Sequence, residues 1–256
     1  MDAQHAAARA FAWAGAVLFA AALGYFLFSY SVTFGEITAG TIAPGAIAFD
    51  IALFSVFALH HSIFARIRVR AVVRRIVPEQ LERSAYVWVA SLMLIGVCYN
   101  WRAVPGVLWQ LSRPWSWAIA AVQLVGIWLT LRSAAVIDGL ELAGVRQVTI
   151  PNSQFPTPNS LESPNTEEDW KLEVGRWEFR TEGPYGWVRH PIYLGWILVV
   201  FSVGTMTMTR LVFAAISSVY LLIAIPFEER TIRAQSGGGY EDYSRRVRWR
   251  LIPRVY

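Results

Sequence analysis

Two short stretches combine ionisable side chains with aromatic rings at the edges of apolar runs. The first is GPYGWVRHPIYLG, residues 183–195, where Arg189 and His190 precede an apolar run. The second is EER, which begins at Glu228 and follows the next apolar run. Ionisable groups at membrane depth are costly and therefore indicate function. If the two runs form a hairpin, an imidazole, a guanidinium and the carboxylates of Glu228 and Glu229 meet at one membrane face.

Tyr185, Trp187 and Tyr193 would cover such a pocket. A carboxylate can bind an ammonium group or a ribose hydroxyl, and a histidine or arginine can bind a carboxylate. Aromatic rings can cover an adenine or a positively charged sulfur. S-adenosylmethionine carries all of these groups, but the residue types by themselves indicate a zwitterionic nucleoside and no more. The alternative is a cluster of interfacial salt bridges with no ligand.

Two adjacent histidines, His60 and His61, lie in an earlier apolar run with the sequence FALHHSIFAR. On a helix, adjacent side chains point about 100° apart, so the pair is poorly placed to bind one metal ion. The single cysteine, Cys98, lies in an apolar run and offers no cysteine zinc cluster. We therefore expect no metal site. A neutral histidine hydrogen-bonded to a neighbouring helix is the alternative for each of the pair.

The composition requires a membrane to position these residues. The chain is 55% hydrophobic and 16% charged, whereas soluble domains carry about 25% charged residues. A spanning helix needs about 20 mostly apolar residues. The sequence therefore predicts an all-α integral membrane protein with about six transmembrane helices, a C-terminal helical hairpin and a cytoplasmic cofactor pocket. The expected spans lie near 10–33, 45–65, 84–104, 115–137, 190–208 and 211–227.

The arginines indicate the orientation of these spans. With six spans, 20 of the 23 Lys and Arg residues fall on one side of the membrane. The opposite loops hold only Arg102, Arg113 and Arg210. Positive residues favour the cytoplasmic side. We therefore expect a multi-pass protein of the inner (cytoplasmic) membrane with both termini in the cytoplasm.

Three regions are expected along the chain. Residues 1–137 form a four-helix transmembrane region, 138–182 a cytoplasmic loop, and 183–256 a hairpin and tail. The basic tail can lie on anionic membrane lipids. Basic residues sort by membrane side, and no G-x-G-x-x-G motif is present, so no nucleic-acid or dinucleotide partner is expected.

Three C-terminal motifs together resemble a known family. EGPYGWVRHPIYLG, EER and YEDYSRRVRWRLIP are similar to the signature of the isoprenylcysteine carboxyl methyltransferase and phospholipid methyltransferase superfamily. The resemblance implies S-adenosylmethionine as the cofactor, bound at the cytoplasmic membrane face. The cofactor-binding residues expected on this basis, with the ionisable residues of the hairpin, are Trp177, Glu178, Phe179, Arg180, Tyr185, Arg189, His190, Tyr193, Glu228 and Glu229.

Motifs in the N-terminal half resemble one particular group within this superfamily. FALHHSIFARIRVR, VPEQLERSAYVWVASLMLIGVCYNWRAVPGVLW and LAGVRQV resemble the bacterial methanethiol S-methyltransferases. This implies methylation of a small thiol to a thioether. The isoprenylcysteine enzymes carry an arginine shortly before the paired glutamates. Ala224 lies near that place here, which weighs against a prenylcysteine substrate.

Methylation of a thiol requires the thiolate, because the thiolate is the nucleophile. A base or a nearby cation must therefore assist, and the residues expected in this catalytic role are His60, His61 and Arg146. Two alternatives stay open. One is a lipid or prenylcysteine carboxyl acceptor, and the other is a non-enzymatic transporter or assembly factor that shares the fold.

Overall fold

The computed structural model describes residues 3–64, 72–149, 182–236 and 238–256. Within these residues five helices are long and apolar enough to cross a membrane. The expectation of an all-α integral membrane protein is confirmed. The five long helices are α1 (Ala3–Ser31), α2 (Pro44–Phe64), α4 (Glu82–Asn100), α5 (Trp115–Ile137) and α10 (Met208–Gln235).

The expected span near 190–208 differs from the others. Its helix, α9 (Pro191–Phe201), has 11 residues and a length of about 16 Å at 1.5 Å per residue. The hydrocarbon core of a bilayer is about 30 Å thick. The chain then becomes extended, and β2 (Thr205–Thr207) pairs with β1 (Val107–Gln110) in an antiparallel ribbon. The ribbon provides for these backbone groups the hydrogen bonds that a longer helix would have made.

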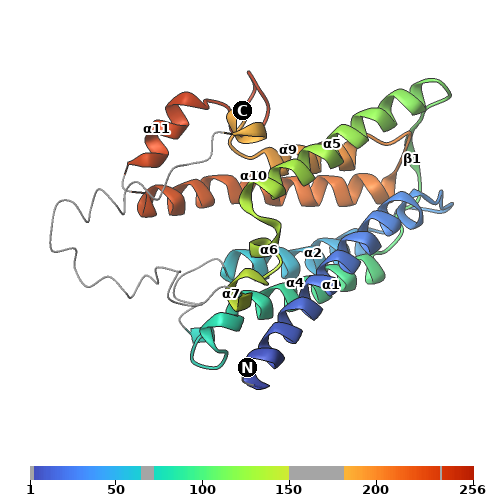
Figure 1. Ribbon diagram of the computed structural model, residues 1–256. Helices are drawn as coiled ribbons and strands as arrows, with labels where there is room; N and C mark the ends of the chain where they lie inside the picture. The colour runs from blue at the N-terminus through green and yellow to red at the C-terminus, as the bar shows by residue number, and fades with distance from the viewer. Residues whose placement is uncertain (1–2, 65–71, 150–181, 237) are drawn as a thin grey trace.

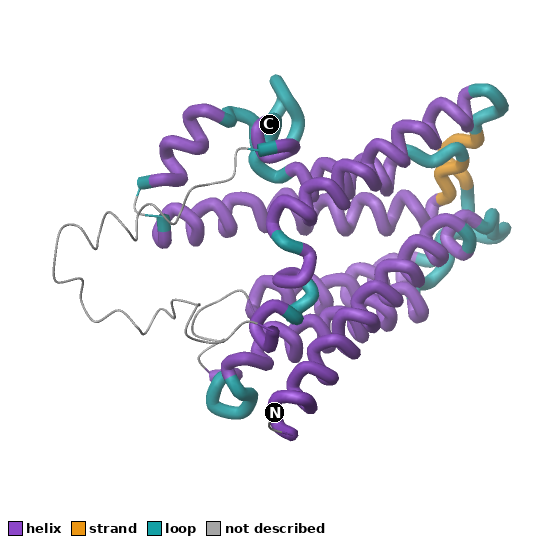
Figure 2. The backbone as a smooth tube through the Cα atoms, in the orientation of Figure 1, coloured by secondary structure: helices purple, strands orange, loops and turns teal. Residues whose placement is uncertain are grey.

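The helices form two layers (Figure 1). One layer contains α1, α2 and α4, and the other contains α5, α9 and α10. The layers converge at the ribbon, drawn in orange in Figure 2, and diverge toward the opposite end. Closely packed aromatic rings fill the space where the layers meet. The fully buried ring of Phe213 lies 5.5 Å from those of Phe26 and Phe34 and 5.0 Å from that of Trp101.

Arg210 joins the two layers of helices beside the ribbon through hydrogen bonds. Its Nε donates to the carbonyl of Tyr30 at 2.9 Å, and its two Nη atoms donate to the carbonyls of Ser31 and Thr205 at 2.6 Å. The last carbonyls of a helix have no partner within the helix. The buried guanidinium therefore caps α1 and joins it to β2 and α10.

Glycines allow α5 and α9 to pack backbone to backbone. A Cβ atom on Gly195 would lie 2.8 Å from the carbonyl oxygen of Gly126 and would also meet Thr130 Oγ1. Small residues at helix contacts are typical of membrane proteins. This contact fixes α9, and with it His190 at the start of α9, against α5.

Two short helices follow α5 and connect the layers at the diverging end, namely α6 (Gly139–Leu142) and α7 (Arg146–Thr149). Asp138 accepts hydrogen bonds from the first amides of α6. The hydroxyl of Ser84, in α4, donates to the carbonyl of Gly144 at 2.6 Å. The division of the chain at 137 and 182 stays a prediction. Further helical elements among the described residues are η1 (Thr33–Gly35), η2 (Glu79–Leu81), η4 (Gly183–Gly186) and α11 (Gly239–Arg246).

Candidate active site

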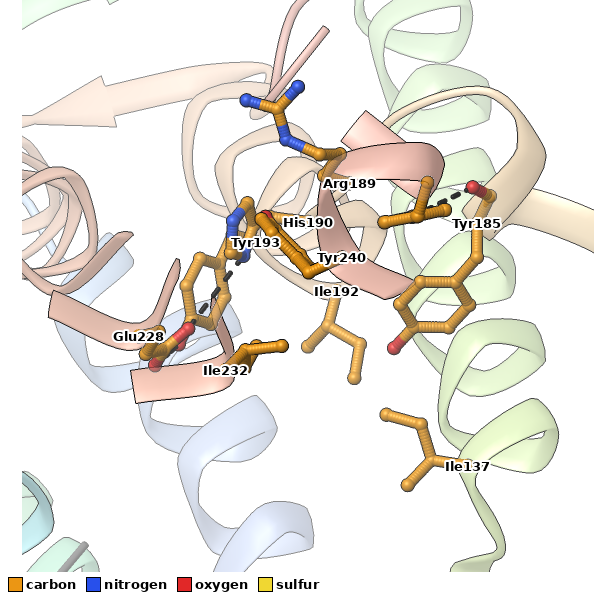
Figure 3. Close-up of a pocket in the computed structure, with 10 residues that line it drawn as sticks. Ile137, Tyr185, Arg189, His190, Ile192, Tyr193, Glu228, Ile232 and Tyr240 are labelled. Carbon is orange, nitrogen blue, oxygen red and sulfur yellow. Dashed lines mark hydrogen bonds and ion pairs between the residues drawn. The ribbon is translucent and has the colours of Figure 1, made fainter. Parts of the chain in front are cut away.

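A pocket of about 270 Å³ lies at the end of the α9–α10 hairpin that is opposite the ribbon (Figure 3). It brings together side chains from α5, η4, α9, α10 and α11. Five of the residues expected to bind a cofactor are among them. The residues that line this hairpin pocket are Ile137, Tyr185, Arg189, His190, Ile192, Tyr193, Glu228, Ile232, Tyr240 and Tyr243.

Glu228 is the accessible carboxylate of the hairpin pocket. The hydroxyl of Tyr193 donates to it, and His190 Nδ1 lies 3.7 Å from its Oε2. The rings of His190 and Tyr193 stack at 5.5 Å with planes 13° apart. The Glu228 side chain remains 43% exposed. A polar ligand can therefore reach a carboxylate whose position is fixed by a phenol and an imidazole.

Glu229 has a different environment, because adjacent helical residues point in different directions. Its side chain is 0% exposed and does not line the hairpin pocket. Arg189 Nε, Arg250 Nε and Arg233 Nη2 lie 2.8, 3.2 and 3.4 Å from its oxygens, and His190 Nε2 lies at 3.4 Å. A charge buried this deeply persists only when it is paired. Glu229 therefore holds the C-terminal tail and orients His190.

The tail also binds the start of α9 through its backbone. The amides of Arg189 and His190 donate to the carbonyls of Trp249 and Arg250 at 2.9 and 2.8 Å. Arg189 Nη1 donates to the carbonyl of Val247 at 2.9 Å. Backbone carbonyls make these bonds, which add to the ion pair between Arg250 of the tail and Glu229. The tail therefore fixes the backbone of Arg189 and His190, which line the hairpin pocket.

The tyrosines of the hairpin pocket are neutral phenols at physiological pH. Burial raises the pKa of Tyr243 to about 12, and burial also raises the pKa of Tyr185. For Tyr240, burial and then the charge of Glu229 raise the pKa. The Tyr243 hydroxyl donates to the carbonyl of Tyr185 at 2.9 Å, which joins α11 to η4. These rings offer flat, uncharged faces to a ligand.

The other predicted site residues lie elsewhere. Trp177, Glu178, Phe179 and Arg180 fall outside the described residues. Arg146 forms an ion pair with Asp138, next to the pocket residue Ile137, but does not itself line the hairpin pocket.

His60 and His61 occupy the last turn of α2, in the facing layer, and do not line the hairpin pocket. Within the described residues, no group of three His, Cys, Asp or Glu side chains could hold a metal ion.

Tyr86 connects the histidines of α2 with the residues of the hairpin pocket, a role that no sequence motif indicates. Its ring stacks on that of His60 at 5.3 Å with planes 9° apart, and its hydroxyl bonds to His61 Nδ1. It also interacts electrostatically with Glu228 and Tyr193. A tyrosine near the start of an apolar helix is usually an interfacial anchor, so only the packing of α4 against the other helices shows the connection.

Comparison with known proteins identifies the family. The model of the isoprenylcysteine carboxyl methyltransferase (ICMT) family matches residues 175–234. Methanethiol S-methyltransferase 2 of Bradyrhizobium diazoefficiens is 33% identical over 211 residues, which cover 82% of this chain and 74% of that protein. The methanethiol S-methyltransferases of Crocosphaera subtropica and Mycobacterium tuberculosis are each 34% identical. Those matches cover 81% and 79% of this chain, and 75% and 76% of the relatives.

No solved structure matches the chain. The sequence matches extend well beyond the hairpin, over about four fifths of the chain, and the structure has the apolar helices of a multi-pass membrane protein. The chain is a membrane methyltransferase and belongs to the family that includes the bacterial methanethiol S-methyltransferases.

Proposed function

We propose that the protein transfers a methyl group from S-adenosylmethionine to a small thiol such as methanethiol. The observation that carries this proposal is the hairpin pocket, where the half-exposed Glu228 lies beside His190 under a set of neutral tyrosines. The names of the relatives support a thiol as the acceptor. The lack of an arginine at Ala224, before the paired glutamates, argues against a prenylcysteine acceptor.

The residues of the hairpin pocket fit this methyl donor. Glu228 would accept hydrogen bonds from its ammonium or ribose hydroxyls, and His190 would face its carboxylate. The rings of Tyr185 and Tyr193 would cover the adenine and the sulfonium. When bound, the donor supplies a methyl group on a good leaving group. Ligand pockets usually measure about 300–1,000 Å³, so the hairpin pocket, at about 270 Å³, accounts for only part of such a site. We assign Trp177, Glu178, Phe179 and Arg180 to the remainder of the same site.

Orientation contributes to the reaction that these residues support. The transfer is an in-line displacement, and holding two reactants in line can supply about 7–11 kcal/mol of the barrier. The fixed stack of His190 on Tyr193 and the buried pairing of Arg189 with Glu229 give the pocket a rigid wall. In this proposal the protein acts mainly by positioning and by excluding water.

We also propose that the hairpin pocket faces the cytoplasm, in the inner membrane, with both termini on that side. Arg102 and Arg113 lie in the loops on either side of β1, and Arg210 lies in the first turn of α10, directly after β2. The other 20 of the 23 Lys and Arg residues belong to the opposite end by the order of the spans. The positive-inside rule then assigns that end to the cytoplasm.

Calorimetric titration of S-adenosylhomocysteine into the purified protein tests the donor site. We expect saturable binding by the wild type. Glu228→Gln should weaken binding roughly 10- to 100-fold, because a hydrogen bond to a charged group contributes about 1.5–3 kcal/mol. The matched control is Glu241→Gln, the same change on α11, where the side chain is 50% exposed and outside the pocket lining. Absence of binding by the folded wild type would refute the proposal.

The acceptor is tested with the same preparation. We expect the wild type to convert methanethiol and S-adenosylmethionine to dimethyl sulfide, which gas chromatography detects. Lipid extracts and a prenylcysteine analogue serve as competing acceptors. Methylation of these in preference to every thiol would assign the protein to the alternative acceptor class.

A further inference from the structure

The imidazole of His60 is unpaired in an unusual way. Both ring nitrogens are buried, and neither has a hydrogen-bond partner among the described residues. A neutral imidazole carries one donor and one acceptor nitrogen. Leaving a buried polar group unsatisfied costs about 1–3 kcal/mol, and such a group in a native protein requires an explanation. A bound ligand that donates a proton to this ring would explain why its nitrogens have no partner among the described residues.

The other two residues expected to activate a thiol are already engaged. His61 Nδ1 bonds to the hydroxyl of Tyr86, and Arg146 is paired with Asp138. Within the described part of the chain, His60 is the member of this set with both polar atoms buried and unpaired. The structure therefore distinguishes His60 from His61 and Arg146 as the candidate base, which the sequence alone could not do.

Tyr86 links His60 to the hairpin pocket. Its ring lies parallel to that of His60 at 5.3 Å, and its hydroxyl lies within electrostatic range of Glu228 in the hairpin pocket. The helix that carries His60 meets α10, which carries Glu228, where the hydroxyls of Ser55 and Tyr220 bond.

The rings of Phe64 and Tyr86 pack with their centroids 5.1 Å apart. The guanidinium of Arg83 lies 5.1 Å from the centre of the Tyr86 ring. This is a mainly aromatic environment with one cation, which suits a small apolar thiol that becomes a thiolate.

We propose that the methyl acceptor binds beside His60 and Tyr86, between α2, α4 and the hairpin pocket, and that His60 takes the proton of the thiol. This inference rests on the proposed function. The thiol sulfur forms a bond to the methyl carbon while the bond from that carbon to the sulfonium sulfur breaks. The bonding electron pair stays on the departing sulfur, and the thiol proton passes to His60 and then to solvent. Tyr86 is a positioning residue that holds the imidazole ring.

Two thiols of different acidity provide the test. Methanethiol is mostly protonated at neutral pH and needs a base, whereas pentafluorothiophenol is already ionised and does not. We expect His60→Asn to lower kcat with methanethiol by about 10²- to 10⁴-fold, the usual contribution of a general base. With pentafluorothiophenol we expect less than a tenfold loss. Affinity for S-adenosylhomocysteine should stay within about threefold of wild type, because His60 does not line the hairpin pocket.

Control variants separate catalysis from structure. His5→Asn makes the same change at an exposed position of α1 and should have no effect. Tyr86→Ala removes a ring beside the acceptor and the ring that holds the imidazole, so it should raise KM for methanethiol and lower kcat without changing the affinity for S-adenosylhomocysteine; Tyr86→Phe, which keeps the stacked ring, should restore most of both. If His60→Asn does not fold, His60→Ala with added imidazole replaces it, and recovery of methanethiol turnover is expected.

The outcomes distinguish this inference from the proposed function. Equal losses with both thiols, or a methanethiol-specific loss in His61→Asn but not in His60→Asn, would overturn the assignment of His60 while the wild-type activity upholds the proposed function. Failure of imidazole to restore turnover would also overturn it. If the wild type methylates neither thiol, the proposed function and this inference fall together.

Discussion

Replacing Glu229 by Gln should release the tail without unfolding the helices. Arg189 is only 8% exposed, and breaking a buried pair costs about 3–5 kcal/mol. Arg250 and Arg233 are 32% and 40% exposed, so each of their pairs contributes about 0–1 kcal/mol. Arg189 keeps its bond to the carbonyl of Val247. We therefore expect a cost near the lower limit, about 3 kcal/mol.

Hydrogen exchange measures this cost at the contact itself. The amides of Arg189 and His190 are protected by the carbonyls of the tail. A loss of about 3 kcal/mol corresponds to roughly a 100-fold change in an equilibrium constant. Mass spectrometry of the peptide that contains these amides should therefore show protection reduced roughly 100-fold, while peptides from α1 exchange as in the wild type.

Glu241→Gln is the matched control for this measurement. Glu241 lies 3.9 Å from Arg233 but is 50% exposed, so its loss should leave the protection of Arg189 and His190 unchanged. Unchanged protection in Glu229→Gln would refute the role given to the buried carboxylate. Equal loss of protection in α1 and in the tail would mean that Glu229 stabilises the whole molecule and not the tail in particular.

Three further predictions concern stability. Arg210→Met should lower the free energy of unfolding in detergent by about 3 kcal/mol, because three carbonyls lose a charged donor; Arg113→Met, at an exposed position, should change it by less than about 0.5 kcal/mol. Gly195→Ala should cost about 1–3 kcal/mol through overpacking against α5, whereas Gly24→Ala, with open space around it, should not destabilise; thermal unfolding compares the two, and equal stability would refute the tight contact. Burial raises the pKa of Tyr243 to about 12 from about 10 when unfolded, so its stabilising contribution is full below pH 10 and is lost as the pH rises toward 12; denaturation of Tyr243→Phe should lack that decline, and an identical pH profile would contradict the assignment.

The sequence predicted the parts of the fold that depend on local composition. The long apolar runs became α1, α2, α4, α5 and α10, since a spanning helix is recognisable from its own residues. Tyr185, His190 and Glu228 were predicted to meet because a short connection between two apolar runs forces them antiparallel, and the structure brings these three residues to one pocket.

The features that the sequence did not reveal all depend on contacts between distant segments. The pairing of Val107 with Thr207 replaces the end of an expected span with a strand, and nothing in either segment indicates its partner. Glu228 and Glu229 are chemically identical in the sequence, and only the contacts of Glu229 with Arg189 and with Arg250 of the tail make it a structural anchor. The position of Tyr86 likewise depends on the angle between the layers.

Because the layers diverge from the ribbon (Figure 1), a small rotation at the ribbon would produce a larger displacement at their far ends. The two layers are joined at the ribbon and by Arg210, and α6 and α7 connect them again at the diverging end. His60 and Glu228 belong to α2 and α10, in the parts of these helices that lie farther from the ribbon. The 28 residues of α10 span about 42 Å at 1.5 Å per residue. A rotation of about 5° at the ribbon would displace the far end of α10 by roughly 3–4 Å by the same geometry, which is comparable to the separation of two reacting atoms. Side chains at the ribbon, remote from any bond that is made or broken, therefore set the gap across which a methyl group would move.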